Sequence, residues 1–212
     1  MSFGLINVGA TFQRVMDIAF KGLINKPVVV YLDDITVFSK ERSNRLHDLK
    51  QIFEHCRRYG ISLNPKKSFF SLNQGKLLGF VVSKDDIYID PDRIKEIYDI
   101  PFPHNKKSMQ SFLGQINFVK RFVPDFSHIV LQLQNMIKKI SMFKWGPAKK
   151  EALDSIKQSI INAPTLNTPN FSNHFMLYTL ASDSSYAAVL TQINNQNLEA
   201  TISFHSLNLQ GA

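Results

Sequence analysis

Two adjacent carboxylates between apolar runs are the most informative chemical feature of the sequence. Val28-Val29-Val30-Tyr31-Leu32 leads into Asp33-Asp34, and Ile35-Thr36-Val37-Phe38 follows. Two β-rich runs around two turn-forming residues predict a tight hairpin with both acids at its tip. Adjacent carboxylates repel each other, and removing them from water is costly unless a cation or hydrogen bonds compensate.

Such a pair of acids suits a hard divalent cation. Proteins bind Mg²⁺ through a few carboxylates together with substrate phosphates. Two such ions about 3.5–4 Å apart can activate a hydroxyl group and stabilise a leaving phosphate. The hairpin tip therefore offers part of a phosphoryl-transfer site. A simpler interpretation stays open, because Asp is also a common turn residue.

Helices and further strands surround this hairpin in the expected order of elements. Helical spacing of apolar residues predicts a helix over 12–23 and a second one that Gly60 ends. Asp90-Pro91 marks the start of a third helix, and Ser108 is expected to cap a fourth. Further helices are expected over 129–140 and about 147–162, and strands over 61–63, 69–72, 77–82, 87–90, 175–179, 186–193 and 198–205. This order indicates an α+β protein.

Composition excludes several classes of protein. The 212 residues are 44% hydrophobic with 17 Phe, which excludes intrinsic disorder as the main state. The one cysteine, Cys56, excludes a disulfide framework and a Cys-rich zinc site, and it fits an intracellular setting. The longest apolar run, Val28 to Leu32, is far too short for a membrane span, and the N-terminus shows no secretory pattern.

The basic charge is concentrated in the first three quarters of the chain. All 25 Lys and Arg residues lie at or before Lys157, so residues 1–157 carry +10 and residues 158–212 carry −2. This asymmetry indicates two modules with different partners. Basic residues occur as the adjacent pairs Arg57-Arg58, Lys66-Lys67, Lys106-Lys107, Lys120-Arg121, Lys138-Lys139 and Lys149-Lys150. Such pairs suit a polyanion backbone, although they are equally typical of solvated helix faces.

Several sequence blocks match a known family in its own order. They are Ser2–Gln13, Tyr31–Asp34, Leu63–Ser68, Leu77–Ser83, Ser111–Phe126, Phe143–Trp145 and Ala163–Leu166. With these blocks the chain resembles the reverse transcriptase region of a gypsy-class LTR retrotransposon Pol polyprotein. The resemblance implies a partial palm with an antiparallel sheet and helices, a helical thumb, and a truncated RNase H-like domain. It places the palm at 1–90, the thumb at 91–140 and the RNase H-like part at 141–212.

The resemblance implies roles for the hairpin residues. Asp33 is implied as a ligand of the catalytic Mg²⁺ or Mn²⁺ ions, with Asp34 as its acidic neighbour. Tyr31 and Leu32 are implied to form the floor under the primer terminus. The simple turn interpretation loses weight once these residues stand in the family's order of blocks.

Other residues are implied to contact the nucleotide. Phe3 and Gly4 are expected beside the incoming nucleotide, and Gln13 is expected to touch the template or the nucleotide. Lys66 or Lys67 is expected on the pyrophosphate side, with Lys67 as the catalytic candidate. An exposed solubilising charge remains the alternative for each lysine.

A third set of residues is implied to hold the template–primer duplex. Gly79 is expected in the primer grip, although a strand bulge also explains a glycine there. Lys106, Lys107, Lys120 and Arg121 are expected to hold the sugar-phosphate backbone without reading bases.

The chain departs from the family pattern at two places that bear on activity. The match begins within the palm, so the fingers and another metal-binding Asp are expected elsewhere in the polyprotein. The family's leading RNase H ligand falls on Leu180, which cannot bind Mg²⁺. We therefore expect an RNA-directed DNA polymerase fragment that is inactive in isolation, with template–primer, deoxynucleoside triphosphates and the rest of Pol as partners. The alternatives are a non-catalytic nucleic-acid binder and a relic without a stable fold; the oligomeric state stays open.

Overall fold

The computed structural model describes residues 7–39, 41–138, 142–183 and 185–209. Its contacts divide the chain into two compact units, Met1–Ser71 and Leu72–Ala212. No helix among the described residues is both long and apolar enough to cross a membrane. The division into palm, thumb and RNase H-like part at residues 90 and 140 stays a prediction.

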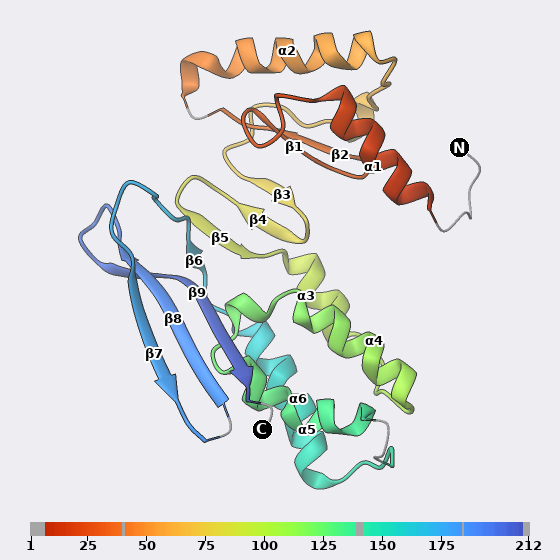
Figure 1. Ribbon diagram of the computed structural model, residues 1–212, viewed down its shortest axis with the longest axis vertical. Coiled ribbons are helices and arrows are strands. Elements are labelled where there is room, and N and C mark those ends of the chain that lie inside the picture. The colour runs from red at the N-terminus through yellow and green to blue at the C-terminus, as the bar shows by residue number, and fades with distance from the viewer. Residues whose placement is uncertain (1–6, 40, 139–141, 184, 210–212) are drawn as a thin grey trace. The chain divides into compact units, whose positions relative to one another are not determined.

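Unit 1 consists of one hairpin covered by two helices (Figure 1). Its elements are α1 (Val8–Ala19), β1 (Val28–Tyr31), β2 (Asp34–Val37), the one-turn helix η1 (Arg42–Asn44), α2 (Arg45–Arg58) and the one-turn helix η2 (Pro65–Lys67). β1 and β2 pair antiparallel with Tyr31 opposite Asp34, which confirms the predicted hairpin. The two-residue turn is Leu32-Asp33, one residue earlier than the predicted Asp33-Asp34, so Asp34 belongs to β2.

The core of unit 1 lies between one face of the hairpin and the two helices. Val28 and Val30 are buried on β1, and their partners Val37 and Ile35 pack against the same cluster. Met16, Ala19, Phe20, Ile52 and Cys56 complete this core from the helices. Burial raises the pKa of the Cys56 thiol, which keeps it protonated and unreactive. Because side chains alternate along a strand, burying this face turns the next residues of the hairpin outward.

The C-termini of α1 and α2 are both capped. His55 Nδ1 lies 2.7 Å from the carbonyl oxygen of Ala19, the last residue of α1. After α2, Gly60 adopts a left-handed φ of 64°, and the Ile61 N–H donates to Cys56 O at 2.8 Å. This is a Schellman motif, and it confirms that Gly60 ends the helix.

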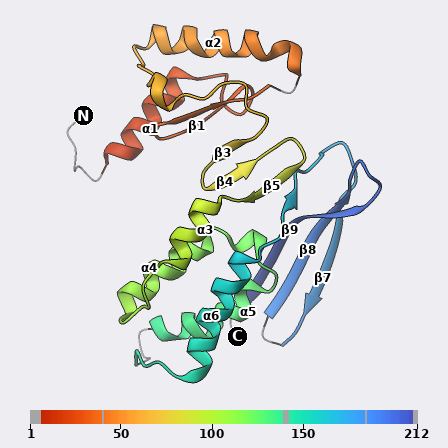
Figure 2. The same ribbon diagram turned by 180° about the vertical axis from the view of Figure 1, so that it is seen from behind.

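Unit 2 combines two sheets with a group of helices (Figures 1 and 2). Its first sheet contains β3 (Gly75–Leu77), β4 (Phe80–Val82), β5 (Asp86–Ile89) and β6 (Leu166–Asn167) in that order, and its second contains β7 (Met176–Ala181), β8 (Ser185–Ile193) and β9 (Glu199–Asn208). The helices are α3 (Pro91–Tyr98), α4 (Lys106–Asn117), η3 (Lys120–Phe122), α5 (Phe126–Ile137) and α6 (Pro147–Ile161). In both views α5 and α6 lie side by side.

One apolar cluster holds the helices of unit 2 to its sheets. Its fully buried members come from α3, α4, η3, α5, α6 and β6, among others, and include Ile97, Phe112, Phe122, Leu133, Ile156 and Leu166. The three-stranded sheet is joined to α5 by hydrogen bonds. The Ser127 hydroxyl donates to Ser206 O at 2.7 Å, and Asn208 Nδ2 donates to Ser127 O at 2.9 Å.

The structure corrects some predicted elements. Residues 61–63 and 69–72 are not strands. The strand expected over 77–82 is a hairpin, because Leu78 and Gly79 both have positive φ and turn the chain between β3 and β4. Ser108 is not the cap of α4: Asn105 is the N-cap, and its side chain accepts from the Ser108 N–H at 2.8 Å. Asp90-Pro91 does begin α3, with the Asp90 side chain accepting from the Asp92 N–H.

Two glycine substitutions are expected to change stability in opposite directions. Gly60→Ala forces a left-handed alanine into open space, so it should destabilise unit 1 by about 1 kcal/mol through backbone strain alone. Gly114→Ala lies within α4, also in open space, and should stabilise unit 2 by about 1 kcal/mol. Amide hydrogen exchange in α2 and α4 measures each effect. Equal changes in the free energy of unfolding for the two substitutions would contradict the left-handed conformation assigned to Gly60.

Candidate functional site

The two carboxylates lie at a tight, exposed turn. Tyr31 pairs with Asp34, so Leu32 and Asp33 form the two-residue connection between β1 and β2. All four residues are exposed. Within the described part of the chain, the Asp33 and Asp34 side chains make no hydrogen bond or ion pair and are open to a ligand.

Leu32 has an unusual backbone conformation for its residue type. Its φ is 48°, in the left-handed region where a side chain other than glycine is strained. Such strain persists only where surrounding contacts enforce it, and it is concentrated at functional sites. The turn next to the acids is therefore held by its surroundings.

Those surroundings come from α1. Gln13 Oε1 accepts a hydrogen bond from the Leu32 N–H at 2.8 Å, and Gln13 Nε2 donates to Val30 O at 3.3 Å. Gln13 Nε2 also donates to Asp17 Oδ1 at 3.0 Å. The structure thus brings Gln13 together with the predicted hairpin residues, and the contact it makes is with the turn itself.

The two predicted lysines occupy a separate short helix of unit 1. Lys66 and Lys67 lie in η2, which the Asn64 side chain caps by accepting from the Lys66 N–H at 3.0 Å. Both lysines are exposed, and neither side chain has a partner in the described ranges. The cap holds the direction of this basic turn while leaving both ammonium groups in water.

Phe3 and Gly4 lie outside the described residues, so their expected place beside a nucleotide stays a prediction.

Gly79 of unit 2 is fixed by a close aromatic contact. Its φ is 76°, and a Cβ at this position would lie 3.1 Å from Phe118 Cε1. Phe118 stacks on Phe80, the next residue after the turn, with ring centroids 4.5 Å apart. Asp90 N–H also donates to Gly79 O at 3.0 Å. Both backbone conformation and space therefore require glycine here.

A lysine links this hairpin to α3. Lys76 Nζ contacts Asp92 Oδ2 and lies 3.0 Å from Asp90 Oδ2. The hydrogen bond between Lys76 and Asp92 raises the pKa of the lysine and lowers the pKa of the aspartate. This solvent-exposed ion pair links β3 to the start of α3 and adds little to stability.

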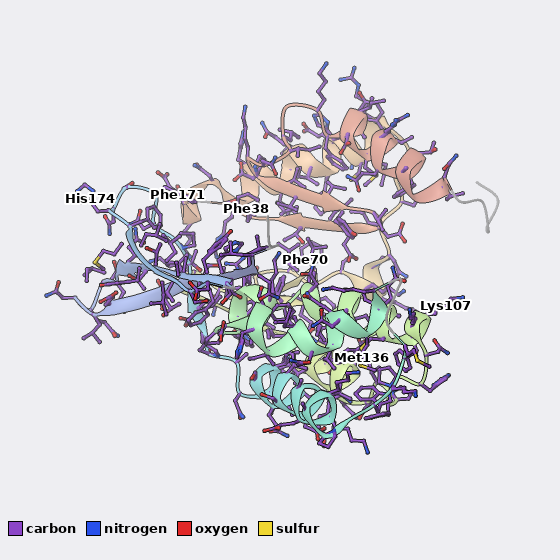
Figure 3. The ribbon with its side chains drawn as sticks, turned by 60° about the horizontal axis from the view of Figure 1, so that its bottom comes forward. Phe38, Phe70, Lys107, Met136, Phe171 and His174 are labelled. Atoms are coloured by element: carbon purple, nitrogen blue, oxygen red, sulfur yellow. The ribbon has the colours of Figure 1, made fainter. Side chains whose placement is uncertain are left out.

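The basic residues of the helical part have different surroundings. Lys106 Nζ donates to Lys138 O at 2.7 Å. Lys107 and Lys120 are exposed, and Figure 3 shows Lys107 on the opposite side of unit 2 from Phe171 and His174. Arg121 instead turns inward, with Nη2 3.5 Å from Ile202 O on β9 and a buried Nε without a hydrogen bond. Lys107 and Lys120 thus present charge to solvent, whereas Arg121 first contacts the protein's own sheet.

Carboxylate oxygens on Asp33 and Asp34 are suitable ligands for a hard divalent cation. Among the residues that the structure describes, no group of three or more His, Cys, Asp or Glu side chains gathers in one place. Leu180, where the resemblance implies the family's leading RNase H ligand, is exposed on β7, and its alignment with that ligand stays a prediction. Asp33 and Asp34 thus offer two adjacent carboxylates, and no third such side chain joins them among the described residues.

Sequence reasoning missed the mutual contacts of these residues. It assigned Gln13 to a substrate and left Asp17 without a role. The available signal was the four-residue spacing of Gln13 and Asp17, which puts both side chains on one helix face. Nothing in the sequence indicated that Arg121 would reach β9, because that contact joins segments 81 positions apart.

Two family profiles match the chain. Residues 1–82 match the family described as reverse transcriptase (RNA-dependent DNA polymerase), and residues 145–212 match the RNase H-like domain found in reverse transcriptase. The Pol polyprotein of transposon 297 from Drosophila melanogaster is 32% identical over 98% of this chain. The chain belongs to the reverse transcriptase and RNase H-like region of retrotransposon Pol polyproteins.

Other relatives of this Pol region agree. The Pol polyprotein of Drosophila melanogaster transposon 412 is 31% identical over 92% of the chain, and the Tf2-3 polyprotein of Schizosaccharomyces pombe is 28% identical over all of it. The chain spans about a fifth or less of these relatives, namely 20% of the transposon 297 protein and 16% of the other two.

Solved structures show the same fold. The foamy viral protease-reverse transcriptase in complex with dsDNA has a TM-score of 0.78 and 24% identity over 99% of this chain and 44% of its own. The same viral protein with an RNA/DNA hybrid has a TM-score of 0.76 and 24% identity over 99% of this chain and 28% of its own. The α+β architecture of a partial reverse transcriptase with an RNase H-like part is thereby confirmed.

The left-handed glycine of the β3–β4 turn gives a stability prediction. Gly79→Ala should destabilise unit 2 by about 2 kcal/mol, because it adds backbone strain and pushes on the Phe118 ring. Gly75→Ala, in β3 with open space around it, is the control and should stay within about 0.5 kcal/mol of the unaltered chain. The fluorescence of Trp145, which lies in unit 2, follows the unfolding. Equal midpoints for the two variants would contradict this account.

Proposed function

We propose that this chain supplies the acidic hairpin and part of the duplex-holding surface of an RNA-directed DNA polymerase. The reaction is attack of a primer 3′-hydroxyl on the α-phosphate of a deoxynucleoside triphosphate, with release of pyrophosphate. The observation that carries the proposal is the exposed Asp33-Asp34 pair on a turn of fixed conformation, in a chain of this family. Template–primer, the triphosphate and the remainder of Pol are the proposed partners.

The chain's own carboxylates meet the first requirement of a divalent metal ion. Asp33 and Asp34 are exposed and, within the described ranges, unpaired, so their oxygens are available to Mg²⁺ or Mn²⁺. When bound, such an ion offsets phosphate charge and favours the deprotonated hydroxyl. Reverse transcriptases and RNase H-like domains generally use divalent metals. Without an ion, the two carboxylates repel both each other and an incoming triphosphate.

The remaining residues of unit 1 position the substrate in this proposal. Tyr31 lies on the same outward face as its partner Asp34, opposite the buried face, and with Leu32 it forms a floor for the primer end. We propose that Phe3 and Gly4 contact the incoming nucleotide. Lys67, with Lys66 next to it, approaches the pyrophosphate side as a cation and proton donor.

Unit 2 holds the duplex in this proposal. The Gly79 turn supports the primer backbone, and Lys106, Lys107 and Lys120 contact phosphates without reading sequence. Arg121 either binds phosphate together with these lysines or only holds β9 through its contact with Ile202 O. The salt dependence of duplex binding by Arg121→Ala distinguishes the two roles.

The 212-residue polypeptide by itself is proposed to be inactive. A two-metal site requires carboxylates on both ions, and in the described ranges no third acid joins Asp33 and Asp34. We propose that another segment of Pol completes the site. Mg²⁺-dependent primer extension by the purified chain would overturn this part of the proposal.

Removing one carboxylate tests the catalytic role. In the Pol region that contains this chain, Asp33→Asn should lower primer extension by about 1,000-fold or more, because one metal ligand is lost. Asp99→Asn is the matched control, because Asp99 is an exposed acid at the end of α3 and its side chain has no partner among the described residues. Full extension by Asp33→Asn would exclude the catalytic assignment.

A non-catalytic nucleic-acid binder is the second candidate, favoured by the charge of +10 over residues 1–157. It predicts that the chain binds an RNA/DNA duplex with steep salt dependence, unchanged by Asp33→Asn. Lys107→Ala should lower the slope of log affinity against log salt by about 1, and Arg121→Ala should change it less. Fluorescence anisotropy of a labelled duplex measures both slopes. Absence of binding at low salt would remove this candidate.

A further inference from the structure

Gln13 is bound to the turn that carries the two acids. We propose that Gln13 is a positioning residue for Asp33 and Asp34, holding the left-handed Leu32 turn with its carboxamide, and that Asp17 orients this carboxamide. The inference rests on the proposed metal-binding role of the two acids. It assigns Gln13 a role within the protein in place of a contact with nucleic acid.

The contacts of Gln13 imitate those of a neighbouring strand. Paired residues in an antiparallel ladder alternate between hydrogen-bonded and non-bonded pairs. Since Tyr31 and Asp34 close the two-residue turn as a bonded pair, the peptide groups of Val30 point away from β2, along the open edge of β1. Gln13 occupies this edge: it accepts from the Leu32 N–H and donates to Val30 O, as the peptide of an added strand would.

The orientation of the amide follows from its partners. The Leu32 N–H can only donate and Val30 O can only accept, so Oε1 and Nε2 of Gln13 have one possible arrangement. The second N–H of Nε2 is used by Asp17 Oδ1 at 3.0 Å. Both N–H groups of the Gln13 amide and one lone pair of its oxygen are therefore used within the protein. Only the second lone pair of the oxygen is left to form a hydrogen bond with a base.

The hydrogen bonds of Gln13 to Leu32 and Val30, here called the Gln13 clamp, lie directly beside the proposed metal ligands. Leu32 directly precedes Asp33, and its φ of 48° sets the direction in which the chain leaves the turn. A leucine relaxes out of this region when support is lost. Relaxation of Leu32 would redirect Asp33 relative to Asp34, whereas the apolar core on the other face of the hairpin would remain. Gln13 thus controls the geometry of the acid pair more than the stability of the fold.

The test uses the full chain with Mn²⁺ as the probe and two readouts. The hydrogen-exchange rate of the Leu32 amide shows whether the Gln13 clamp is formed. Paramagnetic broadening of the amide NMR signals of residues 32–35 shows whether Mn²⁺ binds at the tip of the hairpin. In the unaltered chain Mn²⁺ should broaden these amides, and Asp33→Asn should reduce the effect. Gln13→Leu should speed Leu32 exchange by about tenfold, the effect of losing one hydrogen bond, and should weaken the Mn²⁺ affinity several-fold.

A rescue pair separates positioning from general destabilisation. Gln13→Glu keeps the acceptor for the Leu32 N–H but places a carboxylate against Val30 O and Asp17, so it should behave like Gln13→Leu. Adding Asp17→Asn removes the like charge and supplies a donor, and should recover about threefold or more in both readouts. Gln158→Leu, at an exposed position of α6, is the control substitution and should change neither. Exchange at Val29 and Thr36, paired within the hairpin, shows that each variant keeps its fold.

The outcomes distinguish the clamp from the metal site. If Mn²⁺ does not broaden the tip amides of the unaltered chain, the metal role fails and the inference fails with it. If the unaltered chain binds Mn²⁺ at the tip and Gln13→Leu binds it equally well, only the clamp is wrong. Faster Leu32 exchange without a change in Mn²⁺ affinity also overturns the positioning role. The positioning role is supported if Gln13→Glu loses both the slow Leu32 exchange and the Mn²⁺ affinity, and if adding Asp17→Asn recovers them.

Discussion

The alternation of side chains along one short hairpin is the constraint on which unit 1 depends. Val28 and Val30 must be buried beneath α1 and α2, so Tyr31 and Asp34 must face the other way. The free energy of burying the apolar face therefore keeps the adjacent acids at the exposed end of the hairpin. A shift of the register by one residue would bury a carboxylate and expose the valines, which makes the observed pairing strongly preferred.

The β1–β2 and β3–β4 turns both place a leucine, Leu32 or Leu78, in the left-handed region, but they differ in what lies beside it. At the β3–β4 turn, Gly79 takes the left-handed conformation without strain and lets Phe118 approach. At the β1–β2 turn Asp33 follows the leucine, and an amide on a neighbouring helix supports Leu32. A turn that relies on an external contact is open to adjustment through that contact, which suits a site whose ligands require a defined direction.

Much of the fold could be predicted because its signals are local. The hairpin at residues 28–37, the stop at Gly60, the start at Asp90-Pro91 and the helix near 147–162 each follow from a few neighbouring residues. The wrong predictions have physical reasons. Residues 61–63 and 69–72 have strand-like composition but find no partner strand, and Asn105 took the cap because its side chain forms a reciprocal pair with Ser108. For the site, residue types predicted the acidic tip. The contacts of Gln13 and Arg121 depend on distant segments that no local pattern specifies.

The smallest strand of unit 2 affects how the chain reaches its folded state. β6 is only Leu166–Asn167, yet it forms the edge of the first sheet by pairing with Asp86 and Ile87. On a ribosome, β3, β4 and β5 emerge early, and the open side of β5 stays uncovered until α3, α4, α5 and α6 have all been made. Closing such a long loop is entropically slow and leaves an unpaired strand edge in the meantime. During synthesis, this strand edge is open to a chaperone or an aggregating neighbour until β6 pairs with it.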